Sequence, residues 1–309
     1  MNNKILITGA KGQLGEEIRK KAVKFPEFDY IYTDFDELNI VDKQAVINFV
    51  DKNQPAAIIN CAAYTAVDKA ESDIEKTKEI NVTGVQNLVS AAEKSGIFLL
   101  HISTDFVFDG LSSTPYTETD KPNPVGIYAK TKFEGEQLIT KSKIDSAIVR
   151  TSWLYSEHHS NFLNTMIRLD TEKQSINVVF DQIGTPTAAC DLAKVLLLML
   201  RKKIIEKDTS IKGIFHFSNE GVCSWYDFAL TIMKSAHLKC KVFPVRTSEY
   251  PTPAKRPAYS VLDKAKIKKT LGIEIPHWSE SLNVIIQKLF NFNSAYTIQV
   301  KTSVGEIVF

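Results

Sequence analysis

The stretch that decides the fold is KILITGAKGQLG, residues 4–15. Its first five residues are mostly apolar and β-branched, which predicts a buried parallel strand. Gly9, Gly12 and Gly15 follow at intervals of three, a spacing that allows a tight turn, close approach to a pyrophosphate and packing of the next helix. A helix predicted over residues 13–23 would direct the amides of Gly12, Gln13 and Leu14 at the phosphates. The stretch therefore predicts the start of a dinucleotide-binding unit, with a purely structural turn as the alternative.

The composition is that of an ordinary globular protein. The 309 residues are 44% hydrophobic and 24% charged, and the formal net charge of +2 gives no reason to expect a nucleic-acid partner. The four cysteines are scattered without a CxxC pair, which favours a reducing compartment over a disulfide framework or a zinc site. No apolar run approaches the roughly 20 residues that a bilayer requires, and the N-terminus does not read as a signal peptide. We expect a cytoplasmic protein with no membrane partner.

Alternating strands and helices continue from the glycine-rich stretch through residue 150. The pattern predicts an α/β fold with a Rossmann-type, doubly wound parallel sheet and a smaller, loop-rich α/β substrate lobe. We assign residues 1–150 to the nucleotide-binding domain, with 178–215 returning to it, and residues 151–177 and 216–295 to the lobe. Residues 296–309 alternate weakly and suggest an extra strand or hairpin of unknown role. The predicted strands are 4–8, 30–33, 57–60, 98–103, 147–151, 176–180 and 214–218, and the predicted helices are 13–23, 42–52, 76–95, 128–140, 162–169, 188–201 and 225–236; prolines 244–257 predict a loop.

Ligands of such sheets bind beyond the carboxyl ends of the strands, so the residues after each strand are the candidates for chemistry. Asp34 ends the second predicted strand, 19 residues after Gly15, the distance at which an acid usually binds the adenosine ribose. Its charge would repel a 2′-phosphate and favour NADH, whereas Lys11 would offset that repulsion. The expected cofactor is therefore NADPH or NADH, with the choice left open.

Tyr128 and Lys132 are four residues apart at the start of a predicted helix, so they share one face of it. A nearby ammonium lowers the pKa of a phenol and makes it a usable proton donor. Thr104 ends the fourth predicted strand and would hydrogen-bond the carbonyl oxygen that Tyr128 protonates. Such a pair arises by chance in a chain of this composition, and the candidate site depends on its coincidence with Thr104 and the nucleotide loop.

With these residues the chain resembles the extended short-chain dehydrogenases/reductases and, more narrowly, the dTDP-4-dehydrorhamnose reductase family. The matching segments span roughly residues 4 to 290 and come in the same order as in that family. They are residues 60–71 (NCAAYTAVDKAE), 81–84 (NVTG), 101–110 (HISTDFVFDG), 115–118 (PYTE), 150–153 (RTSW), 181–187 (DQIGTPT) and 256–260 (RPAYS). The resemblance implies reduction of the 4-keto group of dTDP-4-dehydro-6-deoxy-L-mannose to dTDP-L-rhamnose with NAD(P)H.

The same resemblance assigns roles to single residues. Tyr128 is the proton donor, Lys132 also holds the nicotinamide ribose, and Thr104 binds the sugar carbonyl beside Asp105. Trp153 lies against the sugar, with a core tryptophan as the plainer reading. Independently of the resemblance, Arg256 in its proline-flanked loop would pair with the nucleotide diphosphate through its guanidinium, with a solvated arginine nearly as plausible. The remaining matched positions contact the cofactor. Asn39 and Ile40 lie near the adenine, and Asn39 replaces an aspartate of the family. Four more positions lie in the loop after the third strand: Ala62, Ala63, Tyr64 and Thr65.

Partners and alternatives follow from the same comparison. A nucleotide-sugar substrate and a homodimer are expected. Some relatives bind magnesium at a dimer interface, and Glu16 and Glu17 fall near the relevant place, but no further ligands match and we predict no metal. One alternative is another nucleotide-sugar ketoreductase, dehydratase or epimerase; dehydratases follow the threonine with Asp-Glu, whereas Asp105 is followed here by Phe106. A second is a non-catalytic regulatory subunit like the methionine adenosyltransferase β subunit, which the presence of Thr104, Tyr128 and Lys132 does not exclude.

Overall fold

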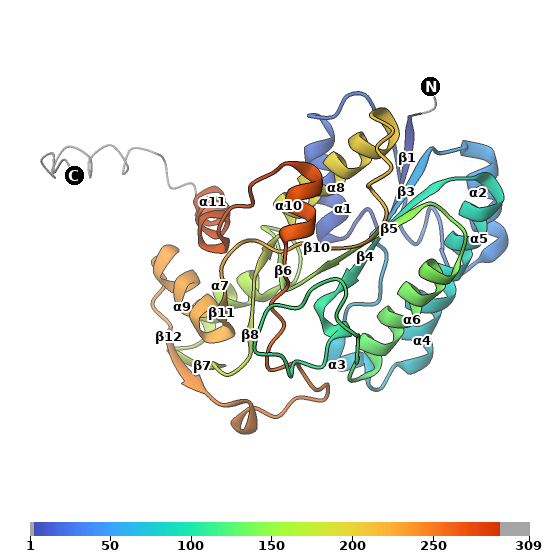
Figure 1. The fold of residues 1–309 in the computed structure, drawn as a ribbon. Helices are drawn as coiled ribbons and strands as arrows, with labels where there is room; N and C mark the ends of the chain where they lie inside the picture. Colours follow the sequence, from blue (N-terminus) through green and yellow to red (C-terminus); the bar gives the residue numbers. More distant parts are fainter. Residues whose placement is uncertain (1–2, 291–309) are drawn as a thin grey trace, which may run out of the picture.

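A six-stranded parallel sheet forms the centre of the computed structural model, which describes residues 3–290 (Figure 1). The strand order is β10-β5-β4-β3-β1-β2, so β1 lies next to the edge strand β2, and β3, β4, β5 and β10 follow in turn on its other side. The apolar run that begins the sequence is buried between two neighbours, as predicted. The strands of this sheet are β1 (Lys4–Thr8), β2 (Asp29–Tyr32), β3 (Ala57–Asn60), β4 (Phe98–Thr104), β5 (Ser146–Thr151) and β10 (Gly213–His216).

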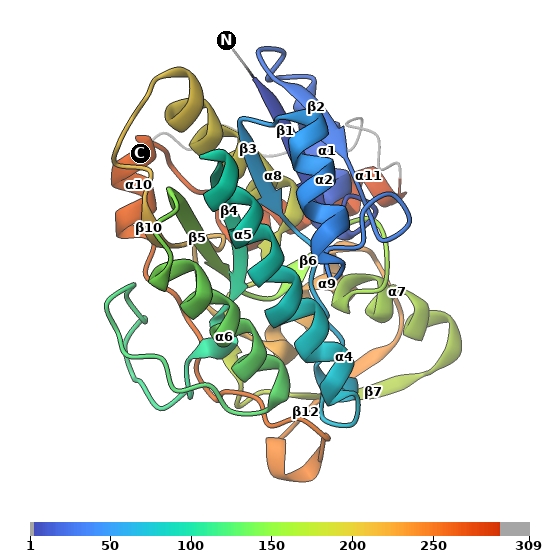
Figure 2. The same ribbon diagram turned by 90° about the vertical axis from the view of Figure 1, so that its right-hand side faces the viewer.

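Helices cover both faces of the sheet, which confirms the doubly wound class. On one face α1 (Gln13–Ala22) packs against α8 (Ala189–Leu200), and their aliphatic side chains share a core with β1, β3 and β5. On the other face, turned toward the viewer in Figure 2, lie α2 (Lys43–Asn53), α5 (Val85–Ser95) and α6 (Ile127–Lys141). Burial of both sheet faces explains why the strands read as continuous apolar runs.

The long helix predicted over residues 76–95 is helical throughout but changes its pitch. It consists of α4 (Ile74–Lys78), a π-helical segment η1 (Glu79–Gly84) and α5, which ends at Gly96 with φ +64°. The π segment contains Asn81, whose side chain is buried and bonded to neighbouring segments. π-helical turns of this kind are frequent at functional sites, because they re-aim a side chain within a helix.

The second lobe is built around a separate apolar core. Three helices contribute most of it: α7 (Phe162–Glu172), α9 (Trp225–Ser235) and α11 (Trp278–Phe290). Short strands in three two-stranded pairs surround the core. The remaining elements are α3 (Val67–Ala70), α10 (Ala265–Leu271), β6 (Leu154–Tyr155), β7 (Ser175–Val179), β8 (Ile183–Gly184), β9 (Thr187–Ala188), β11 (Cys223–Ser224), β12 (Lys241–Val245), the 3-10 turns η2 (Asp105–Val107) and η4 (Thr247–Glu249), and the π-helical turn η3 (Arg201–Ile205).

The proline-rich segment differs from the sequence prediction. Pro244 lies inside β12, which runs parallel to β7, and not in a loop. Proline is tolerated there because β12 pairs with one neighbour only and is therefore an edge strand. The helices α10 and α11 were also not predicted from the sequence.

The boundaries between the two lobes differ from those predicted, because the chain passes between the lobes at other residues. Val178 and Ala188 pack with the second core, so the return to the sheet begins with α8 and not at residue 178. Ile267 and Leu271 of α10 pack with the first core, although the sequence assigned them to the substrate lobe. The strand or hairpin expected at 296–309 lies outside the described residues. Within residues 3–290 there is no helix long and apolar enough to cross a bilayer.

Candidate active site

The glycine-rich turn after β1 forms one end of a large cavity along the carboxyl edge of the sheet. Gly9 has φ +66°, and a Cβ on it would lie 2.6 Å from the backbone nitrogen of Ala62. A Cβ on Gly15 would lie 2.5 Å from the carbonyl oxygen of Gly9, so no side chain fits at either position. Gly12 caps α1 without a side-chain hydrogen bond, which leaves the amides of the first turn available to an anion. This cradle fits the pyrophosphate of a dinucleotide.

The end of the cavity at which the adenosine is expected is formed by residues after β2. Asp34 lines the cavity there, and its carboxylate accepts hydrogen bonds from the backbone nitrogens of Lys11 (2.9 Å) and Phe35 (2.8 Å). Asn39 and Ile40 line the same end, and the Asn39 side chain accepts from the backbone nitrogen of Val41 (3.0 Å). The structure thus brings together the three residues that the sequence predicted for this end.

The loop after β3 forms a wall between the two ends. Ala62, Ala63 and Thr65 line the cavity, as predicted, together with Cys61. Tyr64 is not among the lining residues, because its hydroxyl donates to Asp73 (3.1 Å) on the other side of the loop. The predicted cofactor contact of Tyr64 therefore has no support in this geometry.

Asn81 was missed as a functional residue, although it starts one of the family-like segments. Its side-chain oxygen accepts from the backbone nitrogen of Tyr64 (2.9 Å), and its amide group donates to the carbonyl of Tyr64 and to Thr131 (3.2 Å each). Asn81 therefore ties the loop after β3 to α6. A polar residue inside the buried stripe of a predicted helix was the signal available in the sequence.

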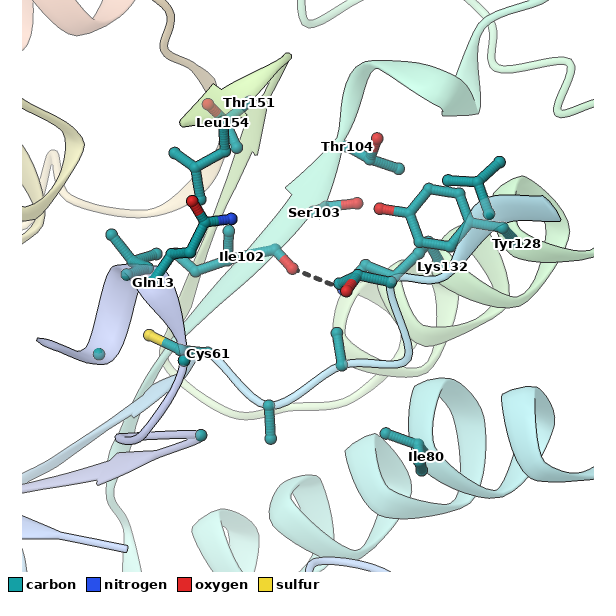
Figure 3. A pocket seen from close by; sticks show the side chains of 18 of the residues that line it. Gln13, Cys61, Ile80, Ile102, Ser103, Thr104, Tyr128, Lys132, Thr151 and Leu154 are labelled. Carbon is teal, nitrogen blue, oxygen red and sulfur yellow. Dashed lines mark hydrogen bonds between the residues drawn. The ribbon is translucent and has the colours of Figure 1, made fainter. Parts of the chain in front are cut away.

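The predicted catalytic residues meet where β4 ends and α6 begins (Figure 3). Thr104 and Lys132 are buried, and the rings of Tyr128 and Phe106 meet edge to face with centroids 5.7 Å apart. The hydroxyls of Tyr128 and Ser103 point toward each other, and Thr104, which also lines the cavity, lies next to them. The N-terminus of α6 is held by Glu71, whose carboxylate accepts from the backbone nitrogen of Ile127 (2.8 Å). Glu71 is a second positioning residue that the sequence reasoning missed.

The electrostatics of this group differ from the sequence expectation. The ammonium of Lys132 donates to the carbonyl of Ile102 (2.7 Å), and burial lowers its pKa to about 8. Burial also raises the pKa of Tyr128 to about 12, an effect that the neighbouring Thr104 hydroxyl only partly offsets. The expected lowering of the phenol pKa by Lys132 is therefore absent: burial raises this pKa, the charge of Asp105 adds to the rise, and Lys132 is not among the groups that shift it. At neutral pH the phenol carries its proton, which is the form a proton donor requires.

Asp105 lies beside the catalytic residues as a buried carboxyl group. It is 2% exposed, and one of its oxygens accepts from the Thr104 hydroxyl (3.1 Å). Burial raises the pKa of Asp105 to about 6. A carboxyl group that titrates near neutrality beside Thr104 can change the charge of the site within the physiological range.

The far end of the cavity carries aromatic side chains from the second lobe. Trp153, with φ +46°, stacks on Trp225 with centroids 3.6 Å apart, and both line the cavity. A Cβ on Gly184 would lie 2.6 Å from the Trp153 ring, so only glycine allows this stack. The sequence did not predict Trp225 as a site residue. Its position directly after the helix-capping residue Ser224 was the available indication that it lies at the start of a helix.

Arg256 closes the cavity on the side of the second lobe. Its guanidinium makes a two-pronged ion pair with Asp68 of α3, at 2.7 Å and 3.0 Å, and Asp68 also accepts from the backbone nitrogen of Ala254 (3.1 Å). The Arg256 guanidinium holds the pKa of Asp68 below its usual range. The arginine is thus neither solvated nor unpaired: it links the two lobes at the cavity wall.

A group of metal-ligand type joins α1 to the segment after β6. Glu17, Glu157 and His158 have ligand atoms within 4.8 Å of one another. The ammonium of Lys20 hydrogen-bonds to all three, at 2.8 Å from Glu17 and 2.6 Å from His158. Glu16, which the sequence placed near a metal site of relatives, instead faces His159 at 3.1 Å. The lysine supplies the positive charge that these carboxylates require.

The cavity measures about 1060 Å³, at the upper limit of ordinary ligand sites, which suits a dinucleotide together with a second ligand. The fold and this site define the chain as a nicotinamide-dependent oxidoreductase of the short-chain dehydrogenase/reductase class. Residues 3–291 match the model of the family described as RmlD substrate binding domain. The chain belongs to this family, that of the dTDP-4-dehydrorhamnose reductases.

Individual relatives and solved structures support this family assignment. A dTDP-4-dehydrorhamnose reductase of Aggregatibacter actinomycetemcomitans is 43% identical over 91% of this chain and 98% of its own length. A crystal structure of a dTDP-4-dehydrorhamnose reductase from Clostridium acetobutylicum is 45% identical, with a TM-score of 0.87 over 93% of this chain and 99% of the other. One from Bacillus anthracis, solved in complex with NADP, is 37% identical with a TM-score of 0.87, covering 93% of this chain and all (100%) of the other.

Proposed function

We propose that this chain reduces the 4-keto group of dTDP-4-dehydro-6-deoxy-L-mannose to give dTDP-L-rhamnose, with Tyr128 as the proton donor. The observation that carries the proposal is the meeting of the Tyr128 and Thr104 hydroxyls in one cavity with the glycine cradle after β1. That cavity belongs to a chain whose relatives are named for this reaction. The order of the elements along the cavity suggests the pyrophosphate at α1, the reacting carbonyl at the end of β4, and the sugar nucleotide toward Trp153 and Arg256.

The cofactor, when bound, supplies the hydride, and the protein supplies orientation and a proton. The amides at the start of α1 bind the pyrophosphate, and Asp34 accepts hydrogen bonds from the adenosine ribose. Lys132 keeps its ammonium form below about pH 8 and binds the nicotinamide ribose through the donors that Ile102 leaves free. Each of these groups comes from the end of a strand or the start of a helix, so their spacing is set by the sheet.

At the reacting end, Thr104 turns its hydroxyl proton from Asp105 to the keto oxygen and thereby orients that oxygen. Tyr128 transfers its phenolic proton to the same oxygen as negative charge develops there. The buried phenol keeps its proton throughout the neutral range, which is the form that a proton donor requires. Trp153, held by its stack on Trp225, lies against the sugar.

Reduction is favoured over sugar dehydration by the residue after Asp105. Dehydration requires protons to be removed from and delivered to the sugar, and the expected glutamate is replaced by Phe106. The Phe106 ring packs edge to face against Tyr128 and offers no proton. This observation supports simple reduction.

Two further features belong to the proposal. We infer a cytoplasmic location, which is supported by the four free cysteines Cys61, Cys190, Cys223 and Cys240. We also infer a homodimer, as the family resemblance implies; light scattering distinguishes it from a monomer of 34.7 kDa.

A coupled assay tests the reaction. Purified protein is mixed with NADH or NADPH and with the keto sugar nucleotide generated in situ, and the loss of nicotinamide absorbance is followed. We expect consumption that depends on the sugar nucleotide, with dTDP-L-rhamnose identified as the product by NMR. The C4 epimer as product would change the assigned sugar, and cofactor binding without turnover of this sugar would support another keto sugar or a regulatory subunit.

A further inference from the structure

Ser103, near the end of β4, carries a buried hydroxyl that the proposed reaction does not use. The residue is 3% exposed and lines the cavity directly before Thr104. Its Oγ makes no hydrogen bond with any of the described residues. A buried hydroxyl without a partner costs free energy, and native proteins keep few such groups. An unpartnered hydroxyl that faces a cavity therefore indicates an interaction that forms when the cavity is in use.

The Ser103 hydroxyl faces Tyr128. Figure 3 shows that the two hydroxyls point toward each other. Ser103 lies on β4 and Tyr128 on the first turn of α6, so regular structure fixes both positions. The hydroxyl of Thr151 is also buried without a partner and lines the cavity, but in Figure 3 it lies at the end of β5, apart from Tyr128. The direction of its hydroxyl therefore distinguishes Ser103 from Thr151.

Tyr128, as the proton donor, requires a hydrogen-bond donor of its own. When its proton moves to the keto oxygen, a negative charge remains on the phenol oxygen. Burial raises the pKa of Tyr128 to about 12, and the charge of Asp105 adds to the rise, so the surroundings of the phenol oppose this charge. A hydrogen bond donated to the phenolate would stabilise it and so favour the proton transfer.

The other polar groups near Tyr128 are engaged elsewhere. The Lys132 ammonium donates to a main-chain carbonyl of β4 (2.7 Å), and Lys132 is not among the groups that shift the pKa of Tyr128. Thr104 has a single hydroxyl proton, which it donates to Asp105 (3.1 Å) and which turns to the keto oxygen in the proposed reaction. The proton of Ser103 has no such partner and is available to the phenol oxygen.

We propose that Ser103 is a further catalytic residue, whose hydroxyl donates a hydrogen bond to the Tyr128 oxygen as that oxygen gives its proton to the substrate. The O–H bond of Tyr128 breaks and a new O–H bond forms on the keto oxygen, whereas Ser103 keeps its own proton. The inference rests on the proposed function, because it requires Tyr128 to be the proton donor. The end of β4 then supplies two hydroxyls, with Thr104 bonded to the substrate oxygen and Ser103 to the phenol oxygen.

Ser103→Ala tests this role in single-turnover measurements of the loss of nicotinamide absorbance. We expect the rate to fall about 10- to 100-fold, because a donor to the developing charge is lost, with the cofactor Kd within about twofold. In the Tyr128→Phe background the same substitution should change the rate less than about twofold, because the oxygen that Ser103 serves is absent. Since the lost hydroxyl has no partner, the urea midpoint of unfolding should stay the same or rise.

Two variants control for the loss of a buried hydroxyl. Ser218→Ala removes a hydroxyl that donates to the carbonyl of Asn219 (3.1 Å) and lies outside the cavity lining. It should lower the urea midpoint and leave the rate unchanged. Thr151→Val removes an unpartnered hydroxyl of the same cavity that lies apart from Tyr128, and it should change the rate less than about threefold.

The outcomes separate the role of Ser103 from the reaction itself. Three results would overturn this role while leaving the reductase assignment intact: an unchanged rate in Ser103→Ala, equal falls in Ser103→Ala and Thr151→Val, or an undiminished effect of Ser103→Ala in the Tyr128→Phe background. A weaker cofactor Kd at an unchanged rate would assign the Ser103 hydroxyl to the cofactor and overturn the role as well. Absence of keto-sugar turnover in the unsubstituted chain would contradict the proposed function and, with it, this inference.

Discussion

The two walls of the cavity are built in different ways. The sheet-side wall consists of residues at the ends of β1, β2, β3 and β4 and at the start of α6, all fixed by one continuous parallel sheet. The loop-side wall consists of Trp153, Trp225 and Arg256, which come from short strands, a helix start and a loop. In the proposed reaction the first wall holds the cofactor and the proton donor, whereas the second holds the groups proposed to recognise the sugar nucleotide. The sheet and the helices next to it thus fix the positions of the proposed reacting groups. Changes in the loops of the other wall can alter substrate specificity without moving those groups.

Replacing the proposed proton donor tests the sheet-side wall most directly. We expect Tyr128→Phe to lower kcat by about 10²- to 10⁴-fold, because the alkoxide loses its proton source, with cofactor Kd within about threefold. Steady-state kinetics and a cofactor titration measure the two effects. Tyr64→Phe is the matched control, since the Tyr64 hydroxyl bonds to Asp73 outside the cavity lining. Near-normal turnover in Tyr128→Phe would refute the assigned role.

The stability of the sheet-side wall depends on a buried ion pair behind it. Arg150 of β5 and Glu136 of α6 are each 1% exposed and make two hydrogen bonds, at 2.9 Å and 2.6 Å. We expect Arg150→Ala to lower the free energy of unfolding by about 3–5 kcal/mol, because Glu136 remains as an uncompensated buried charge. Urea unfolding measures it. Arg168→Ala, which breaks an exposed pair with Glu172, should cost less than about 1 kcal/mol, and equal losses would contradict this account.

A third prediction concerns Asp105, which follows β4 on the sheet-side wall and accepts a hydrogen bond from Thr104. Burial raises the pKa of the Asp105 carboxyl from its ordinary value of 3.8 to about 6 in the native protein. Between pH 3.8 and about pH 6, this group therefore carries a proton in the native protein more often than in the unfolded protein. Through this group, stability therefore falls as the pH rises across that range. We expect Asp105→Asn to raise the free energy of unfolding by about 1–3 kcal/mol at pH 7 and by much less near pH 4. A gain independent of pH would show that the carboxylate charge is not its cause.

The smallest effect is expected on the loop-side wall. Arg256→Ala should raise the KM for the sugar nucleotide about tenfold with kcat within about threefold, because the cavity wall loses its pair with Asp68 and the guanidinium that would exchange Asp68 for the diphosphate. Lys255→Ala, at the exposed neighbouring position that does not line the cavity, is the control. A fall in kcat as large as that of Tyr128→Phe would contradict the claim that the loop-side wall binds the substrate without taking part in the chemical step.

The sequence alone determined the first lobe and most of the sheet-side wall. Strand and helix periodicity is local, and parallel strands bring their carboxyl ends to one edge, so Gly12, Asp34, Thr104 and Tyr128 were predictable as neighbours without coordinates. Tyr64 was the exception, since the side of a loop on which a side chain points is set by its partners, here Asp73 and Asn81.

Only the tertiary structure decided the rest. The strand containing Pro244, the stack of Trp153 on Trp225 and the pair of Arg256 with Asp68 all join segments that are far apart in the chain. The protonation of Tyr128 and Lys132 also depended on tertiary structure, because desolvation comes from every element packed around a group. Local pattern specifies which residues share an edge of the sheet, whereas contacts and burial between distant segments specify what those residues face and which charge they carry.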